Sequence, residues 1–187
     1  MIVSCSNNDD SNAMAPESIE EPQSKIVYTK IEPEFVSQQF GDQFSFDVNN
    51  DNKDDFTIRS YYTGSAGYYD MEIIGTNESG SLSIASWWPY AIPLNVEQEI
   101  SKLTYGQAVY QGWDYSGVAS FLIEQCPEGE ECSQIWNGKY LGLRLMVDGD
   151  IHYGWLQLDI LSAKDWTVKD FAYNATPDMP INTGQKD

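Results

Sequence analysis

The sequence predicts an all-β fold, either an antiparallel β-sandwich or a jelly roll, with a β-barrel as the alternative. Apolar and polar residues alternate from Lys25 to Tyr173, and no long stretch keeps the helical period. The 187 residues include six Trp, twelve Tyr and seven Phe, whose flat rings pack well on a pleated surface. Eight or more short strands separated by turns are typical of these architectures.

Several segments carry the strand pattern in order along the chain. In three of them, apolar side chains recur at every second position and therefore share one face. The run Val118–Ile123 is apolar on both faces, which is typical of a central strand, and a last strand is expected around Trp166–Tyr173. The residues expected to share a face are Phe44, Phe46 and Val48; Phe56, Ile58 and Tyr62; and Leu82, Ile84 and Trp88.

The clearest element is a hairpin whose turn is Asp148-Gly149, two residues that both accept positive φ. Closing the chain at this turn sets Leu141 opposite Leu156 and Gly142 opposite Trp155. The leucines of both arms then lie on the same side of the sheet. Turn chemistry and hydrophobic pattern thus indicate the same register.

The strongest functional motif is the segment Asp47–Phe56, Asp-Val-Asn-Asn-Asp-Asn-Lys-Asp-Asp-Phe. Oxygen-bearing side chains occupy relative positions 1, 3, 5 and 9, and a backbone carbonyl at position 7 completes a set suited to a hard cation. The predicted ligands of one structural Ca²⁺ are Asp47, Asn49, Asp51, the carbonyl of Lys53, and Asp55.

Details of this motif argue against an EF-hand and against an empty turn. Asn52, at the sharp-turn position 6, tolerates left-handed φ. Position 12 is Ile58 rather than a bidentate Glu, and both flanks have strand patterns, so the helix–loop–helix version is excluded. The alternative is an Asx-rich turn without metal, but carboxylates crowded in one loop repel each other without a counter-ion.

Residues 1–24 predict a lipoprotein N-terminus followed by a flexible acidic tether, ahead of a β domain at 25–187. Ile2-Val3-Ser4-Cys5 resembles the lipobox of bacterial lipoproteins, and the following Ser-Asn-Asn-Asp-Asp resembles an export signal of Bacteroidetes surface lipoproteins. Only four residues precede Cys5, so either the true start lies upstream of Met1 or the chain begins late. The alternative for Cys5 is a free thiol in a disordered tail.

The other two cysteines, Cys126 and Cys132, bracket the short loop Pro-Glu-Gly-Glu-Glu. This spacing predicts a disulfide and an oxidising compartment, against the alternative of two free thiols. Together with the lipobox, it predicts export to the outer membrane or the cell surface.

The charge balance restricts the partners. Twenty-nine acidic against ten basic residues give a formal charge of −19, which repels phosphate backbones and therefore excludes nucleic acid as a partner. The same charge disfavours direct adsorption to anionic lipids and attracts divalent cations. No run of 18 apolar residues occurs, so we expect a membrane connection only through the lipid anchor.

No catalytic constellation is recognisable in the sequence. The single histidine, His152, is expected to be packed or to lie at a strand edge, and no Gly-x-Ser-x-Gly elbow or P-loop occurs. Paired carboxylates leave a glycosidase route open. Of these, Asp148 and Asp150 are expected to form the hairpin turn, whereas Asp159 and Asp170 lie in or near strands.

Dense aromatics suggest a binding surface. Flat indole and phenol rings stack on sugar rings, so a possible ligand platform comprises Trp87, Tyr90, Trp113 and Tyr115. The alternative is that most of these rings pack the β core.

Over most of residues 25–184 the order of features resembles a group of uncharacterised secreted proteins of marine and gut Bacteroidetes. The matching segments are Ile31-Glu32-Pro33-Glu34, the Asp47–Phe56 loop, Lys139-Tyr140-Leu141-Gly142, Tyr153-Gly154-Trp155, Ala172-Tyr173 and Pro180-Ile181-Asn182-Thr183-Gly184. The resemblance implies a secreted β domain and assigns no activity.

These observations favour a surface binding or adhesion module, with glycan as a candidate ligand. An accessory structural subunit of an envelope assembly is the second hypothesis. A polysaccharide hydrolase that uses paired carboxylates is the third.

Overall fold

The computed structural model describes residues 23–63, 68–76, 79–84, 90–102, 111–113, 118–121 and 136–187. Within these ranges the protein is all-β, with thirteen strands and no helix. The strands are β1 (Ile26–Val36), β2 (Gln43–Phe46), β3 (Phe56–Thr63), β4 (Tyr68–Gly75), β5 (Gly80–Ile84), β6 (Tyr90–Ala91), β7 (Glu99–Ile100), β8 (Gln111–Trp113), β9 (Val118–Phe121), β10 (Lys139–Val147), β11 (Asp150–Ser162), β12 (Asp165–Asn174) and β13 (Ile181–Asn182).

Eleven strands form one sheet in the order β1-β12-β11-β10-β5-β6-β9-β4-β3-β2, with β8 paired to β5. Neighbouring strands are antiparallel except at β6 and β9, which share one parallel pair, Tyr90 with Ser120. The two end strands, β1 and β2, do not pair, so the sheet is not closed into a barrel. The predicted antiparallel all-β class is confirmed, and the barrel alternative is wrong.

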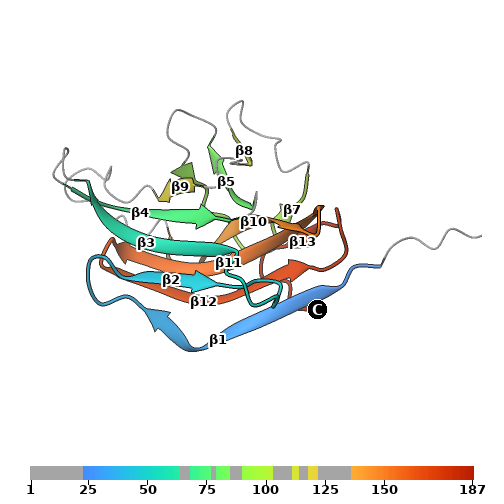
Figure 1. The fold of residues 1–187 in the computed structure, drawn as a ribbon, viewed down its shortest axis with the longest axis horizontal. Helices are drawn as coiled ribbons and strands as arrows, with labels where there is room; N and C mark the ends of the chain where they lie inside the picture. Colours follow the sequence, from blue (N-terminus) through green and yellow to red (C-terminus); the bar gives the residue numbers. More distant parts are fainter. Residues whose placement is uncertain are drawn as a thin grey trace, which may run out of the picture.

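The sheet folds over on itself into two layers around one core. Figure 1 shows β2 and β3 lying over β11 and β12. Buried residues of both layers form a single cluster, and the rings of Phe46 on β2 and Phe171 on β12 lie 5.3 Å apart. Strands of the two layers therefore bury their apolar faces against each other, as a sandwich requires.

The hairpin formed by β10 and β11 has the predicted register. Leu141 lies opposite Leu156 and Gly142 opposite Trp155, and both turn residues have positive φ, 53° at Asp148 and 94° at Gly149. The leucine side chains at alternate positions of β10 are fully buried in the core between the layers.

The opposite face of this hairpin is also covered. A second apolar cluster surrounds Trp155, whose ring contacts those of Tyr28 and Tyr140. The short β7–β13 pair supplies Ile100 and Ile181 to this cluster. Strands β10 to β12 are therefore apolar on both faces, which explains why they form the most buried part of the described chain.

One detail of the strand prediction is wrong. Val48 is fully buried, but β2 ends at Phe46, because the chain leaves the sheet there to form the Asx-rich loop. Tyr62 lies in β3 an even number of residues from Phe56 and Ile58, as predicted for a shared face, and it is 56% exposed. Residues 122 and 123 and Trp88 lie outside the described residues.

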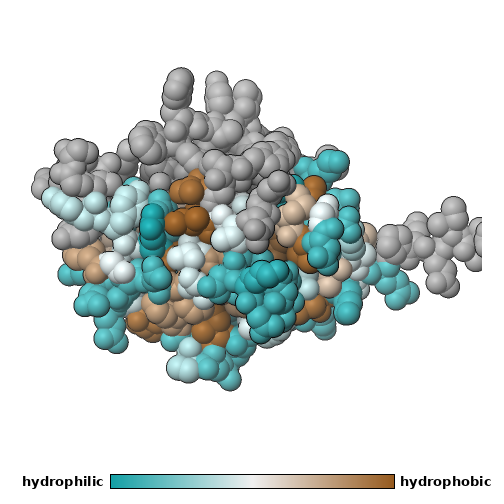
Figure 2. Space-filling view, in the orientation of Figure 1, coloured by the Kyte–Doolittle hydropathy of each residue, from teal (hydrophilic) through white to brown (hydrophobic). Residues whose placement is uncertain are grey.

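The described surface carries scattered apolar residues. On the face seen in Figure 2, hydrophilic residues surround small groups of apolar ones. The exposed large apolar side chains of the described residues are Val36, Phe40, Tyr62, Val96 and Leu161, which belong to different turns and strand ends.

Candidate calcium-binding loop

The Asx-rich loop joins β2 to β3 and is closed at its base by the core. Phe46 and Phe56 pair across the two strands with their rings 5.5 Å apart, and both side chains are buried. The amide of Asp55 donates a 2.9 Å hydrogen bond to the carbonyl of Phe46. These contacts hold the two ends of the loop together, so that eight residues must turn within a short span.

The turn is made by asparagines in the left-handed region. Asn50 has φ of 62° and Asn52 has φ of 68°. Asparagine adopts this conformation more readily than most residues because its short side chain bonds locally to the backbone. The left-handed backbone conformation expected at Asn52 is confirmed.

The side chains at positions 1, 3 and 5 accept hydrogen bonds from the loop backbone. Asp47 accepts the amides of Asp51 at 3.2 Å and Asn52 at 2.6 Å, and Asn49 accepts the amide of Asp51 at 2.9 Å. Asp51 accepts the amide of Lys53 at 2.9 Å. Because a carboxylate offers about four acceptor sites, these bonds orient the oxygens without exhausting them.

Asp55, at position 9, is the buried acid of the loop. Asp55 is 6% exposed, and one of its carboxylate oxygens accepts a 2.8 Å hydrogen bond from the backbone amide of Val48. Burial raises the pKa of Asp55, and the nearby charges of Asp47 and Asp51 add to this, while bonds from the Val48 and Asn49 amides oppose it. Asp55 forms no ion pair with any described lysine or arginine.

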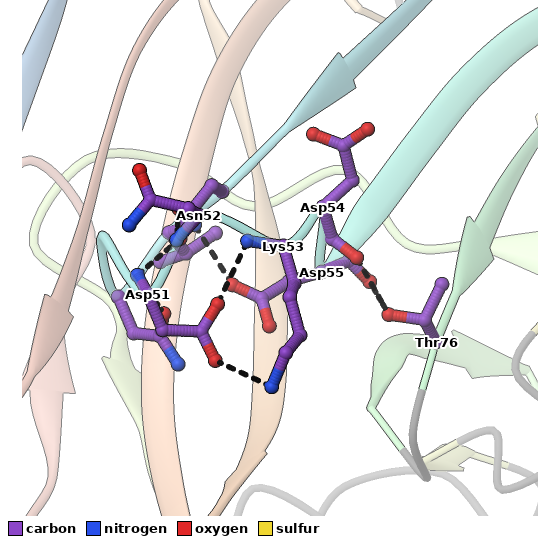
Figure 3. Close-up of polar contacts among 9 residues, drawn as sticks. Asp51, Asn52, Lys53, Asp54, Asp55 and Thr76 are labelled. Atoms are coloured by element: carbon purple, nitrogen blue, oxygen red, sulfur yellow. Dashed lines mark hydrogen bonds and ion pairs between the residues drawn. The ribbon is translucent and has the colours of Figure 1, made fainter.

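The two remaining charged residues of the loop face outward. Figure 3 shows the carboxylate of Asp54 pointing away from the loop, while its backbone carbonyl accepts the hydroxyl of Thr76 at 2.8 Å. The ammonium of Lys53 lies 3.8 Å from a carboxylate oxygen of Asp51, and the Lys53 side chain is largely exposed. This pair is solvated and contributes little to stability.

A hollow of about 490 Å³ opens beside the loop. On one side it is lined by Asn49, Asp51, Lys53 and Asp55 of the loop. The other side is formed by the tip of the β10–β11 hairpin, Met146 to Gly149, and by Tyr173 of β12. The loop and the hairpin tip belong to different layers of the sandwich, so the hollow lies between the two layers.

All five predicted ligand residues are therefore brought into one turn, and four of them line the hollow. In the described part of the chain, no group of three or more His, Cys, Asp or Glu side chains is gathered closely enough to hold a metal ion as they stand. The predicted set differs from such a group because it uses the amide oxygen of Asn49 and the carbonyl of Lys53. The sequence did not predict that Tyr173 and the tip of the β10–β11 hairpin lie beside the loop, since these residues are about a hundred positions further along the chain.

Most of the other predicted site residues lie outside the part of the chain that the structure describes. Cys5, Cys126, Cys132, Trp87 and Tyr115 lie outside the described residues. For the remaining members of the aromatic platform only the backbone is described: Tyr90 lies in β6 and Trp113 in β8, and both strands pair with β5.

Residues considered for catalysis are engaged in structural contacts. His152 is buried, with Nδ1 2.8 Å from the carbonyl of Asn174 and its ring edge-on to Tyr173, so it is packed as expected. Asp159 pairs with Lys169 at 2.5 Å, and Asp170 pairs with Lys186 at 2.9 Å. Each of these two acids is thus held by its own lysine.

No protein-family model, curated protein or solved structure matches this chain. Where the structure describes the chain, no helix is long and apolar enough to cross a membrane.

Proposed function

We propose that this protein is a calcium-binding β-sandwich module, in which one Ca²⁺ bound by the Asp47–Asp55 loop ties β2 to β3. The observation that carries the proposal is the state of Asp55. Its carboxylate is buried, has two further carboxylates nearby, and makes no ion pair in the described residues. Because a buried carboxylate is stabilised when it is paired with an opposite charge or coordinates a metal, a cation in the loop would stabilise the charged form of Asp55.

The chemistry of the loop favours calcium among the common cations. Ca²⁺ takes six to eight oxygen ligands in flexible geometry, whereas Mg²⁺ requires a small octahedron and Zn²⁺ prefers nitrogen and sulfur. Carboxylates of Asp47, Asp51 and Asp55, the amide oxygen of Asn49 and the carbonyl of Lys53 offer oxygen only. Because the carboxylates are not gathered at metal-binding spacing, we expect ion binding to draw them together and to order the loop.

The consequence of binding is stabilisation that depends on calcium concentration. An ion that binds only the folded state at a hundredfold excess over Kd stabilises it by about 2.7 kcal/mol. For a domain of this size, about 1 kcal/mol shifts the unfolding midpoint by about 2–4 °C. The expected shift on adding calcium is therefore about 5–10 °C.

We further propose that the module is exported and lipidated at Cys5, and that it acts at the outer membrane or cell surface as a binding or adhesion domain for glycan or an envelope protein. The lipobox-like Ile2-Val3-Ser4-Cys5 and the net charge of −19 support this proposal. An accessory structural subunit is the second candidate, favoured by the outer edges of β1 and β2, along which no strand of the described residues pairs. The β1 edge is guarded by the exposed residues Lys30, Glu32 and Pro33, which disfavour strand pairing.

Isothermal titration of the full chain with Ca²⁺ tests the calcium site. We expect one site in the wild type, and loss of binding in Asp51→Ala. Asp54→Ala is the matched control, because that carboxylate belongs to the same loop and points away from it. Equal binding by both variants, or no heat with the wild type, would contradict the proposal.

A further inference from the structure

The turn that leads into β10 contains the one Asn-Gly pair of the sequence, Asn137 and Gly138. Both residues are exposed, whereas Trp136, just before them, is fully buried. Gly138 has φ of 62°, and a Cβ built on it would meet no atom within 4 Å. The Asn137 side chain makes no hydrogen bond with any described residue. The side-chain amide of Asn137 is therefore accessible and lies next to a backbone nitrogen that no side chain shields.

A carboxylate holds this backbone nitrogen. The β10–β11 register, in which Lys139 lies opposite Leu158, brings Asp159 across from Gly138. The amide of Gly138 donates a 2.5 Å hydrogen bond to Oδ1 of Asp159, and the ammonium of Lys169 lies 2.5 Å from Oδ2. A hydrogen bond along N–H lies in the plane of the peptide group, so it does not cover the faces of the nitrogen. Asp159 is thus within hydrogen-bond reach of the proton that a general base would remove.

These groups are the reactants of an intramolecular deamidation. The Gly138 nitrogen attacks the side-chain carbonyl carbon of Asn137 while its proton passes to Asp159, and a cyclic imide (succinimide) closes. The C–N bond of the side-chain amide breaks, and ammonia leaves with the proton that Asp159 returns. Water then opens the ring at either carbonyl and leaves aspartate or isoaspartate at position 137. The reaction needs no co-reactant other than water, because the attacking and attacked groups belong to adjacent residues.

Two other exposed asparagines of the described chain lack these features. Asn95 is followed by Val96, whose branched side chain crowds the attacking nitrogen. Asn182 is followed by Thr183, which is also branched and whose amide donates to the carbonyl of Gln98 rather than to a carboxylate. These two asparagines serve as internal references for Asn137.

We propose that Asn137 is a site of spontaneous deamidation, at which the Asp159 carboxylate accepts the proton of the attacking Gly138 nitrogen. The change adds one negative charge near Asp159, and the isoaspartate product also lengthens the main chain by one methylene just before β10. Both products weaken the start of this strand, by like-charge repulsion or by displacement of Gly138 from Asp159. The site is independent of the proposed calcium site.

The test follows the full chain during incubation at mildly alkaline pH, with peptide mapping by mass spectrometry to locate each converted asparagine. We expect the mass gain of an amide-to-acid conversion at Asn137, but not at Asn95 or Asn182, together with isoaspartate detected by enzymatic methylation. Asn137→Gln is the matched control and should release no ammonia from this position over the same time. An unchanged Asn137, or conversion of Asn95 or Asn182 at the same rate, would overturn the proposal.

Two substitutions test the role of Asp159. Asp159→Asn keeps an oxygen acceptor for the Gly138 amide but removes the base, so conversion should slow at least about tenfold. Lys169→Met frees the carboxylate from its ammonium partner, so conversion should become faster. If Asp159 only held the turn in place, both substitutions would loosen it and would change the rate in the same direction. Conversion in Asp159→Asn as fast as in the wild type, or slower conversion in Lys169→Met, would overturn the role of Asp159; urea unfolding checks that each variant is folded.

Discussion

Replacing Asp55 by alanine and by asparagine separates the two tasks of its carboxylate in the absence of calcium. The side chain accepts the amide of Val48, a residue that is fully buried, and it also carries a charge next to Asp47 and Asp51. Asp55→Ala removes the acceptor and leaves buried amides unsatisfied, whereas Asp55→Asn keeps a carbonyl oxygen in the same place and removes only the charge.

The expected magnitudes follow from these contacts. An unsatisfied buried donor costs about 1–3 kcal/mol, and the bond itself contributes about 1 kcal/mol, so Asp55→Ala should lose about 2–4 kcal/mol. In Asp55→Asn, the weaker neutral hydrogen bond is offset by relief of the unpaired charge, and stability should stay within about 1 kcal/mol of the wild type. Asp54→Ala, an exposed change in the same loop, should stay within about 0.5 kcal/mol.

Urea unfolding in chelator, followed by tryptophan fluorescence, measures these differences. The slopes of the unfolding curves should agree among the variants, so that midpoints report stability directly. If Asp55→Asn is as unstable as Asp55→Ala in chelator, the charge of Asp55 is already balanced in the metal-free protein. That result would refute the reasoning that the carboxylate lacks a counter-ion.

Other predictions concern pH and two of the glycines of the β10–β11 hairpin, Gly149 and Gly154. Because the pKa of Asp55 is raised in the folded state, the metal-free protein gains stability from this group at acid pH and loses it as the pH rises through the folded pKa. Thermal unfolding in chelator from pH 4 to 7 should show this loss in the wild type relative to Asp55→Asn, and saturating calcium should reverse it; parallel profiles would contradict it. Gly154→Ala places a Cβ 2.7 Å from the carbonyl oxygen of Ala172 and should cost about 1–3 kcal/mol or more in urea unfolding. In Gly149→Ala the new Cβ meets no atom within 4 Å, but the residue must keep φ of 94°, so the free energy of unfolding should fall by about 1–2 kcal/mol. A larger loss of stability in Gly149→Ala than in Gly154→Ala would contradict the close approach of Gly154 to Ala172.

Features that depend on residues close together in the chain could be predicted from the sequence. The register of the β10–β11 hairpin follows from Asp148-Gly149 and the leucine alternation, because turn geometry and burial each select it independently. The left-handed turn at Asn52 could likewise be predicted, since the loop must reverse within a few residues and asparagine allows it.

Features that depend on distant segments could not be predicted from the chain pattern. Whether the sheet closes into a barrel depends on whether β1 meets β2, and no local signal encodes that contact. The approach of Tyr173 to the Asx-rich loop depends on the packing of one layer on the other. The alternation of apolar and polar residues places Val48 in the strand with Phe44 and Phe46. Val48 is buried, but it lies in the loop that follows β2 rather than in the strand.

The most direct test of the calcium site is thermal unfolding of the full chain, once with excess Ca²⁺ and once with chelator. The proposed site predicts that calcium raises the midpoint by about 5–10 °C in the wild type and in Asp54→Ala, and leaves it unchanged in Asp55→Asn. Equal midpoints in calcium and chelator for the wild type would show that the Asp47–Asp55 loop is a turn without a metal, and would contradict the proposed function.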